Sequence, residues 1–310
     1  MKTVKKIYVI ALALTCSLAV TLKAQNLYIT GGGAIGQFGL DGQAVNTTPD
    51  SGGPFSVAVS GNVMYVANHA NGTIGEYTTS GQTINASLIS GLQGPEDIAV
   101  SGNNLYVVEA GPFFEGYTRG FIGEYTTSGA TVNASLISGL LSPWGIAISG
   151  NNLFVANVAS GTIGEYTTSG ATINASLITG TYGMNLAISG NDLFVVRYPF
   201  GTIGEYTTSG ATVSENLISG LNSPIGIAIS GDDLFISNFG PSLTDSGGFI
   251  GEYTTSGATV NASLISGLDQ PQGIAIGPVP EPSAGTLAGL GATVLWLWRR
   301  RRNGSKLTRS

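Results

Sequence analysis

The sequence predicts an all-β fold: a six-bladed β-propeller with four-stranded blades, in which the N- and C-terminal strands share one blade. Three observations predict it. The composition favours short strands and tight turns, one segment recurs six times, and the first and last copies are incomplete in complementary ways. Each observation is developed below.

The composition favours many turns and a packed interior. The chain of 310 residues contains 47 glycines, and its charged fraction of 10% is far below the roughly 25% of an ordinary soluble domain. The apolar content of 42% is too high for a disordered chain, which cannot bury a core. The only cysteine, Cys16, lies near the N-terminus, so disulfides do not stabilise the main body.

The repeat sets the number of blades. The segment that starts at Asn151 has counterparts at intervals of 36, 41, 48, 40 and 41 residues, close to the 40–45 residues of a propeller blade. The counterparts begin at Asn26, Asn62, Asn103, Asn191 and Asp232.

Each copy contains four short β segments separated by Gly, Ser and Asn turns, which exclude long helices. In one copy these segments are 145–148, 152–157, 162–167 and 172–178. Four strands in each of six copies form a closed ring.

The phase of the repeat predicts how the ring closes. The first copy, which opens on Leu27, lacks a Gly-Ile-Ala-Ile segment, and the last copy supplies a surplus one at 273–276. Joining the two completes one blade from both termini. A solenoid, the alternative, requires distinct caps at its ends.

Three repeated segments resemble NHL-type six-bladed propellers over residues 26–277: Gly-Ile-Ala-Ile, Leu-Phe-Val-Ala-Asn and Ile-Gly-Glu-Tyr. These motifs are short, so the resemblance implies the fold and leaves the function open.

The N-terminus has the pattern of a secretory signal peptide over residues 1–24. Lys2, Lys5 and Lys6 precede an apolar run that ends at Leu22-Lys23-Ala24. A transmembrane anchor, the alternative, requires about 20 apolar residues. We expect the propeller at 25–277 and a separate tail at 278–310.

The tail combines three features in a fixed order. Pro280-Glu281-Pro282 precedes an apolar stretch from Ala284 to Trp298, and Arg299, Arg300, Arg301 and Arg302 follow. This arrangement resembles the PEP-CTERM sorting signal of Gram-negative bacteria, although 303–310 extends beyond its pattern. The resemblance implies an exosortase as partner, transient inner-membrane association through the tail, and delivery to the cell surface or extracellular polymer. An ordinary C-terminal membrane anchor is the alternative.

The charge of the body excludes one class of partner. Between residues 25 and 282, Arg119 and Arg197 stand against all 18 acidic residues, which gives a net charge of −16. Such a body repels phosphate backbones, so we expect no nucleic-acid partner.

The loops divide the predicted propeller into two unequal faces. One carries nearly identical Ser-Gly and Thr-Ser-Gly turns, whereas the other carries variable loops, including insertions at 109–121 and 238–249. Loops on a rigid scaffold often bind ligands, so we expect the ligand on the variable face; drift in unconstrained loops is the alternative. The candidate residues are Phe55, His69, Glu96, Asp97, Arg119, Trp144, Arg197, Tyr198 and Phe239.

The acidic residues do not form a recognisable metal motif. The glutamates of the Ile-Gly-Glu-Tyr segments lie in different blades, too far apart for one coordination sphere, so we expect them to hydrogen-bond between strands. Glu96-Asp97 and Asp232-Asp233 are expected to be solvated. We therefore predict no metal and no cofactor, with one structural Ca²⁺ left open.

The functional prediction is a non-catalytic, exported binding or structural module that contacts extracellular polysaccharide or another surface protein. The alternative is a metal-dependent lactonase or lyase, because gluconolactonases and streptogramin lyases share the fold. His69 has no identifiable catalytic partner, and the polar residues that a metal site would recruit look like ordinary turn residues. These residues are Glu96, Asp97, Asn157, Asn185 and Asn238.

Overall fold

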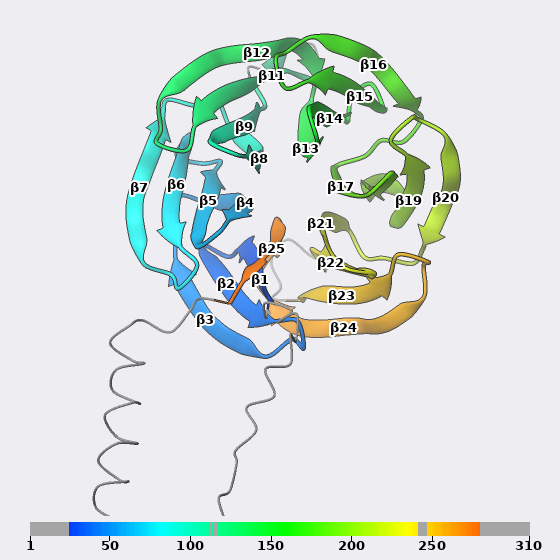
Figure 1. The fold of residues 1–310 in the computed structure, drawn as a ribbon. Helices are drawn as coiled ribbons and strands as arrows, with labels where there is room; N and C mark the ends of the chain where they lie inside the picture. Colours follow the sequence, from blue (N-terminus) through cyan, green and yellow to red (C-terminus); the bar gives the residue numbers. More distant parts are fainter. Residues whose placement is uncertain (1–24, 112, 115–116, 241–246, 280–310) are drawn as a thin grey trace, which may run out of the picture.

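The computed structural model describes residues 25–111, 113–114, 117–240 and 247–279, without the side chains of 113, 114, 117 and 118. Within these ranges, six antiparallel sheets stand in a ring around a central axis (Figure 1). The described residues contain one short 3-10 turn, η1 (Tyr198–Phe200), and none of their helices is long and apolar enough to cross a membrane.

The blades are named A to F in chain order. In each blade the first strand given below is the innermost. Blade A contains β25 (Ile274–Pro278), β1 (Gln25–Gly31), β2 (Ala34–Gly39) and β3 (Ala44–Pro49). Blade B contains β4 (Pro54–Ser60), β5 (Val63–Asn68), β6 (Thr73–Thr78) and β7 (Thr83–Ser90). Blade C contains β8 (Pro95–Ser101), β9 (Asn104–Glu109), β11 (Tyr117–Thr126) and β12 (Thr131–Leu141), with the short β10 (Phe113–Phe114) beside β11.

The remaining three blades repeat the order. Blade D contains β13 (Pro143–Ser149), β14 (Asn152–Asn157), β15 (Thr162–Thr167) and β16 (Thr172–Thr179). Blade E contains β17 (Asn185–Ser189), β18 (Asp192–Arg197), β19 (Thr202–Thr207) and β20 (Thr212–Ile218). Blade F contains β21 (Pro224–Ser230), β22 (Asp233–Asn238), β23 (Gly248–Thr254) and β24 (Thr259–Leu268). The four segments expected in blade D are confirmed to within two residues at each end.

The expected closure is confirmed. Strand β25 pairs antiparallel with β1, from Ile29 opposite Ile274 to Gln25 opposite Pro278. The seam is also joined to blade B, because the Thr30 hydroxyl donates a hydrogen bond to the Phe55 carbonyl at 2.8 Å and accepts one from the Gly273 amide at 2.9 Å. The first and last strands of the propeller are therefore hydrogen-bonded to each other and to blade B.

The core lies between blades rather than in one central mass. Each of six apolar clusters joins a blade to its neighbour, as where Phe154 and Ala156 of blade D pack with Leu186 and Leu193 of blade E. Glycines on the inner strands allow the close approach near the axis. A Cβ on Gly145 would lie only 2.6 Å from the Met184 carbonyl oxygen in the next blade.

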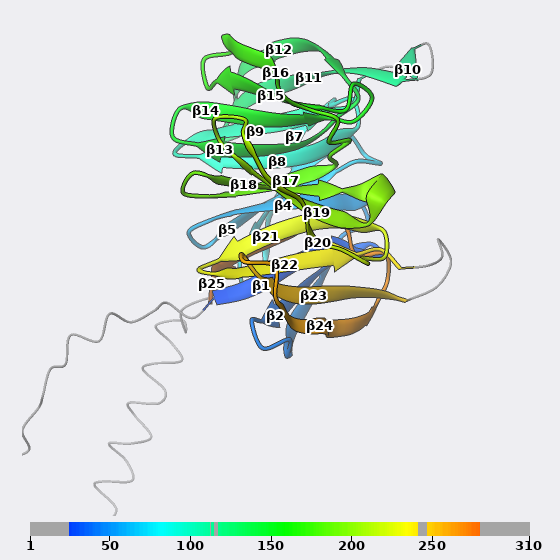
Figure 2. The ribbon, with the colours of Figure 1, turned by 90° about the vertical axis from the view of Figure 1, so that its right-hand side faces the viewer.

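The two faces expected from the loops are confirmed. The turn face carries the Ser-Gly turns and the Thr-Ser-Gly turns, and five blades repeat a 2.8 Å hydroxyl pair there, as between Thr167 and Ser169. The variable face carries the loops between the second and third strands and the connections between blades. Figure 2 shows that β1 begins and β25 ends at the edge of the ring opposite β10. Both termini of the propeller therefore leave from the turn face.

Candidate functional site

The residues that open the innermost strands meet at the variable end of the axis. They surround a hollow of about 450 Å³, here called the mouth. Its lining is apolar except for Gln272 and the Tyr198 hydroxyl, and consists of Phe55, Trp144, Val158, Met184, Tyr198, Ile225, Phe239 and Gln272. A second hollow of about 390 Å³, partly lined by His69, shares Phe55 and Gln272 with the mouth.

An aromatic group covers the blade C side of the mouth. The ring centroid of Phe55 lies 5.4 Å from that of His69 and 5.7 Å from that of Trp144. Phe55 belongs to blade B and Trp144 to blade D. Because blade C lies between these two blades, its equivalent residue lies behind the two rings. That residue is Glu96.

Glu96 is buried at this point, with an exposed fraction of 7%. Its Oε1 lies 3.5 Å from His69 Nδ1, and its Oε2 has no hydrogen-bond partner among the described residues. Burial, with a smaller contribution from the charge of Asp97, raises the pKa of Glu96 to about 8. Burial lowers the pKa of His69, so at neutral pH this contact joins two uncharged groups.

Asp97 has a structural position behind the mouth. It accepts hydrogen bonds from the Ser56 hydroxyl of blade B, the Ile98 amide of its own blade and the Ile146 amide of blade D. Burial raises its pKa to about 6, although these three bonds oppose the rise. The expectation that Glu96 and Asp97 are solvated is wrong, because neighbouring inner strands enclose both carboxyl groups.

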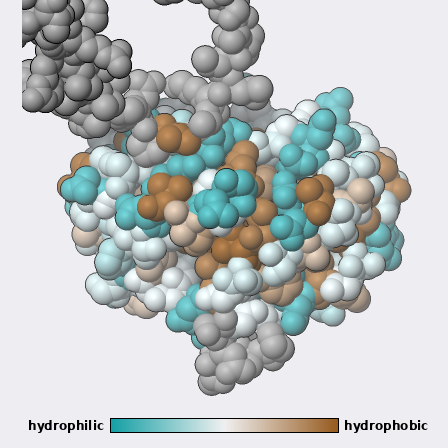
Figure 3. All heavy atoms as spheres, turned by 90° about the horizontal axis from the view of Figure 1, so that it is seen from below, coloured by the Kyte–Doolittle hydropathy of each residue, from teal (hydrophilic) through white to brown (hydrophobic). Residues whose placement is uncertain are grey.

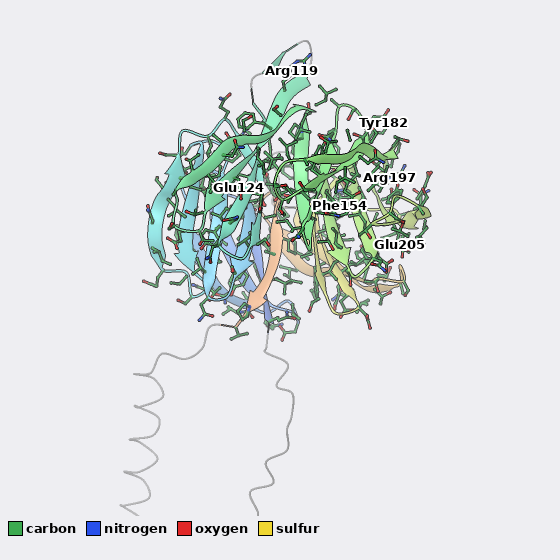
Figure 4. The ribbon with its side chains drawn as sticks, turned by 45° about the horizontal axis from the view of Figure 1, so that its top comes forward. Arg119, Glu124, Phe154, Tyr182, Arg197 and Glu205 are labelled. Atoms are coloured by element: carbon green, nitrogen blue, oxygen red, sulfur yellow. The ribbon has the colours of Figure 1, made fainter. Side chains whose placement is uncertain are left out.

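The two arginines lie away from the mouth lining. Arg197 is buried in blade E, where its Nη1 donates hydrogen bonds to the Glu215 carbonyl at 2.6 Å and to Asn216 Oδ1 at 3.3 Å. Arg119 is exposed on β11, opposite Leu141 of β12, and Figure 4 shows it well apart from Arg197. Of the nine candidates, Phe55, Trp144, Tyr198 and Phe239 line the mouth, and His69 and Glu96 adjoin it.

The Ile-Gly-Glu-Tyr glutamates behave as expected in two blades. The Asn104 and Asn152 amides donate to Glu124 and Glu165 across neighbouring strands, at 2.8 and 2.7 Å. Within the described parts of the chain, no group of three or more His, Cys, Asp or Glu side chains could hold a metal ion.

A separate apolar hollow of about 200 Å³ lies between blades A and F, lined in part by Phe38, Leu268 and Pro271. Apolar side chains gather on this side of the molecule (Figure 3). Gly31, which occupies the position of Asn68 in blade B, is also part of the lining, and a Cβ there would lie only 2.5 Å from the Gln270 carbonyl oxygen.

Sequence reasoning omitted Val158 and Tyr182 from the variable-face candidates. Val158 follows the buried Asn157 in the loop position that His69 occupies in blade B, so alignment of the repeats indicates it. Tyr182 has a stronger signal. The other five copies have Gly, Ser or Gln followed by Pro at this connection, whereas blade E has Tyr182-Gly183.

Comparisons with known protein families match both the C-terminal tail and one segment of the propeller. Residues 278–302 match the PEP-CTERM protein-sorting motif, and residues 51–74 match the LVIVD repeat. The matched tail indicates exosortase-dependent export to the cell surface, although Pro280, Glu281, Pro282 and Arg299 to Arg302 lie outside the described residues. No curated protein is significantly similar in sequence.

Solved structures share the fold. A chain of a nidogen/laminin complex is 15% identical, with a TM-score of 0.64 over 81% of this chain and 98% of its own. A protein of unknown function from Bacteroides caccae is 16% identical, with a TM-score of 0.62 over 82% and 98%. A functionally unknown protein from Desulfotomaculum acetoxidans is 15% identical, with a TM-score of 0.57 over 83% and 100%. At these identities the likeness shows the six-bladed architecture alone.

Proposed function

We propose that the chain is an exported, non-catalytic binding module whose mouth binds an extracellular polysaccharide at the cell surface. The observation that carries the proposal is the pairing of aromatic walls with buried, unsatisfied polar atoms. Glu96 Oε2 and Gln272 Oε1 are both buried without a hydrogen-bond partner among the described residues. Buried polar atoms in proteins are normally bonded. These two are enclosed in the described structure, so the proposal requires the aromatic side chains of the mouth to turn aside when a ligand hydroxyl bonds to them.

The lining and its electrostatics support a neutral sugar as the ligand. Binding sites are typically apolar hollows of about 300–1,000 Å³ with a few polar groups that fix orientation. Phe55 and Trp144 offer apolar faces to the C–H face of a sugar ring. With its pKa at about 8, Glu96 is protonated at neutral pH and can donate a hydrogen bond to a hydroxyl.

The orientation of the ring supports a surface role. The sorting motif continues from Pro278, which lies at the turn face, while the mouth opens on the opposite face. A propeller held or delivered through its C-terminus thus presents the mouth away from that attachment.

The test is a glycan array and isothermal titration with residues 25–279, which contain every strand of the closed ring. Trp144→Ala and Glu96→Ala are expected to weaken binding at least tenfold, and Val213→Ser on an outer strand is the matched control that leaves it unchanged. Failure of the protein to bind any glycan, or equal binding by Trp144→Ala, overturns the proposal.

The alternative function is a metal-dependent lactonase or lyase, and the same protein distinguishes the two. Lactone hydrolysis that requires added Ca²⁺ and is lost with chelator would favour the enzyme. Glycan binding without turnover would favour the module.

A further inference from the structure

Exposed aromatic side chains gather at one place on the variable face. Tyr182, Tyr198 and Phe200 have exposed fractions of 45%, 44% and 52%. The other large apolar side chains that are strongly exposed in the described residues are all aliphatic. Six occupy equivalent positions on the outer strands, and one ends the described chain: Val45, Ile84, Val132, Ile173, Val213, Val260 and Val279.

Tyr182 occupies a backbone position that disfavours it. Its φ is +47°, in the left-handed region where bulky side chains are outliers. The same position has positive φ in all six blades, but the other residues there are smaller or more flexible: Gly53, Gly94, Ser142, Ser223 and Gln270. Strain of this kind collects at functional sites. The ring packs over Gly161 and against Phe200 and still keeps 45% of its surface exposed.

Tyr182 and Phe200 form an ordered pair, here called the shelf. Their ring centroids lie 6.3 Å apart in an edge-to-face arrangement, and the Arg197 guanidinium lies 4.7 Å from the Phe200 centroid. Arg197 is itself fixed by its bonds to the Glu215 carbonyl and Asn216. In Figure 4 Tyr182 and Arg197 lie close together on the blade D and E side of the ring. The shelf is therefore held in place without a ligand.

The shelf adjoins the mouth. Phe200 and Tyr198 belong to the same turn η1, and Tyr198 lines the mouth with Trp144 and Met184. A chain of sugars that begins in the mouth and passes Tyr198 meets Phe200 and Tyr182 next.

We propose that Tyr182 and Phe200 form a second subsite, which stacks against a sugar ring of a neutral polysaccharide outside the mouth. This proposal rests on the proposed function of the mouth. The net charge of −16 over residues 25–282 favours a neutral polymer, because it repels acidic polysaccharides. Arg197 does not offset this repulsion at the shelf, since its side chain is 7% exposed and lies 3.8 Å from the Glu215 carboxylate.

The other repeats supply the substitutions that test the shelf. Tyr182→Ser introduces the residue that blades D and F have at this left-handed position, and Phe200→Ser introduces the equivalent of Ser160 in blade D. Both variants are compatible with the fold, and Tyr182→Ser is expected to leave the Tm unchanged or raise it. A fall of several degrees in Tm for Tyr182→Ser would overturn the proposal, because the ring would then be structural.

The binding probe is a series of cello-oligosaccharides from two to six units, with dextran sulfate as the acidic comparison. We expect the double variant to lose about tenfold in affinity for the hexasaccharide and none for the disaccharide, and the wild type to prefer the neutral series. Unchanged affinity of the double variant at every length refutes the shelf and leaves the mouth intact. If the wild type binds no member of the series or of a wider glycan array, the proposed function fails and the shelf fails with it.

Discussion

Glu96 is expected to make the stability of the propeller strongly dependent on pH. The group is buried beside Asp97, and its pKa lies at about 8 in the folded protein against 4.5 in an exposed glutamate. The folded state therefore binds a proton that the unfolded state releases over this interval, and the free energy of unfolding falls as the pH rises from about 4.5 to about 8. At about 1.4 kcal/mol per pH unit, the interval corresponds to on the order of 5 kcal/mol.

The substitution Glu96→Gln isolates this contribution, because glutamine has a similar shape and stays neutral. The variant should match the wild type near pH 5 and exceed its stability at pH 8.5. For a domain of this size, roughly 2–4 °C of Tm follow from each kcal/mol, so a gap of roughly 10–20 °C between the variant and the wild type is expected at pH 8.5. Asp97 changes in the same direction, but only up to a pH of about 6.

The assay is urea unfolding of residues 25–279 from pH 5 to pH 9. Trp144 is the only tryptophan in this range and lies beside Phe55, so its fluorescence reports on the mouth. Glu215→Gln, at a side chain that is 64% exposed, is the control and should follow the wild-type curve. Parallel curves for the wild type and Glu96→Gln across the whole range would refute the reasoning.

Three further substitutions test the bonds between strands and blades by urea unfolding. Thr30→Val removes the seam bonds to Phe55 and Gly273 and should cost about 1–3 kcal/mol. Thr202→Val, at a buried hydroxyl that has no hydrogen-bond partner among the described residues, is the control, and equal effects at the two sites would contradict the assigned bonds. Asp97→Asn keeps the size of the side chain but cannot accept from Ser56, Ile98 and Ile146 together, which costs about 1–3 kcal/mol. The variant also removes a buried charge whose pKa is raised to about 6, so the loss of stability should be largest near pH 4 and shrink toward pH 7, and a difference from the wild type that is the same at both pH values would contradict this account. Arg197→Met should destabilise the protein by about 1–3 kcal/mol, because it loses the hydrogen bonds to the Glu215 carbonyl and to Asn216. If Glu215→Ala costs more than Arg197→Met, these two hydrogen bonds are not the main stabilising contact of this region.

The repeat alone predicts the ring, because each copy carries its own strand and turn signals. The shared blade follows from the same pattern, since the surplus segment at the end of the chain matches the one missing at its start. The mouth is predictable in part: the first residue of each inner strand is known from the alignment of copies, so Phe55 and Trp144 can be placed near the axis.

The burial of Glu96 is not predictable from its own repeat. Glu96 lies between the blades of Phe55 and Trp144, whose ring centroids are 5.7 Å apart, and its Oε1 contacts His69 of blade B. The destination of Arg197 is hidden for a similar reason, because its partner Glu215 is 18 residues away in sequence and looks like a surface residue. In both cases the side chain is buried by residues from another strand or blade, and the pattern of a single repeat carries no information about those contacts.

The differences between copies separate folding from binding, because some are compensated within the blade and others are not. Blade E has Arg197 where blades B, D and F have asparagine, and it also places Glu215 where four blades have alanine. The new charge therefore receives a partner, and the change is structural. Glu96 brings a buried carboxyl whose Oε1 contacts His69 but whose Oε2 has no partner among the described residues. Tyr182 brings an aromatic ring to a left-handed position, and its contact with Phe200 does not relieve the backbone strain there, so in neither case does the neighbouring residue remove the cost. Such costs persist where a partner outside the chain offsets them. Both uncompensated residues lie on the variable face, one under the mouth and one on the shelf beside it, and that common location is the physical reason to assign this face to the ligand.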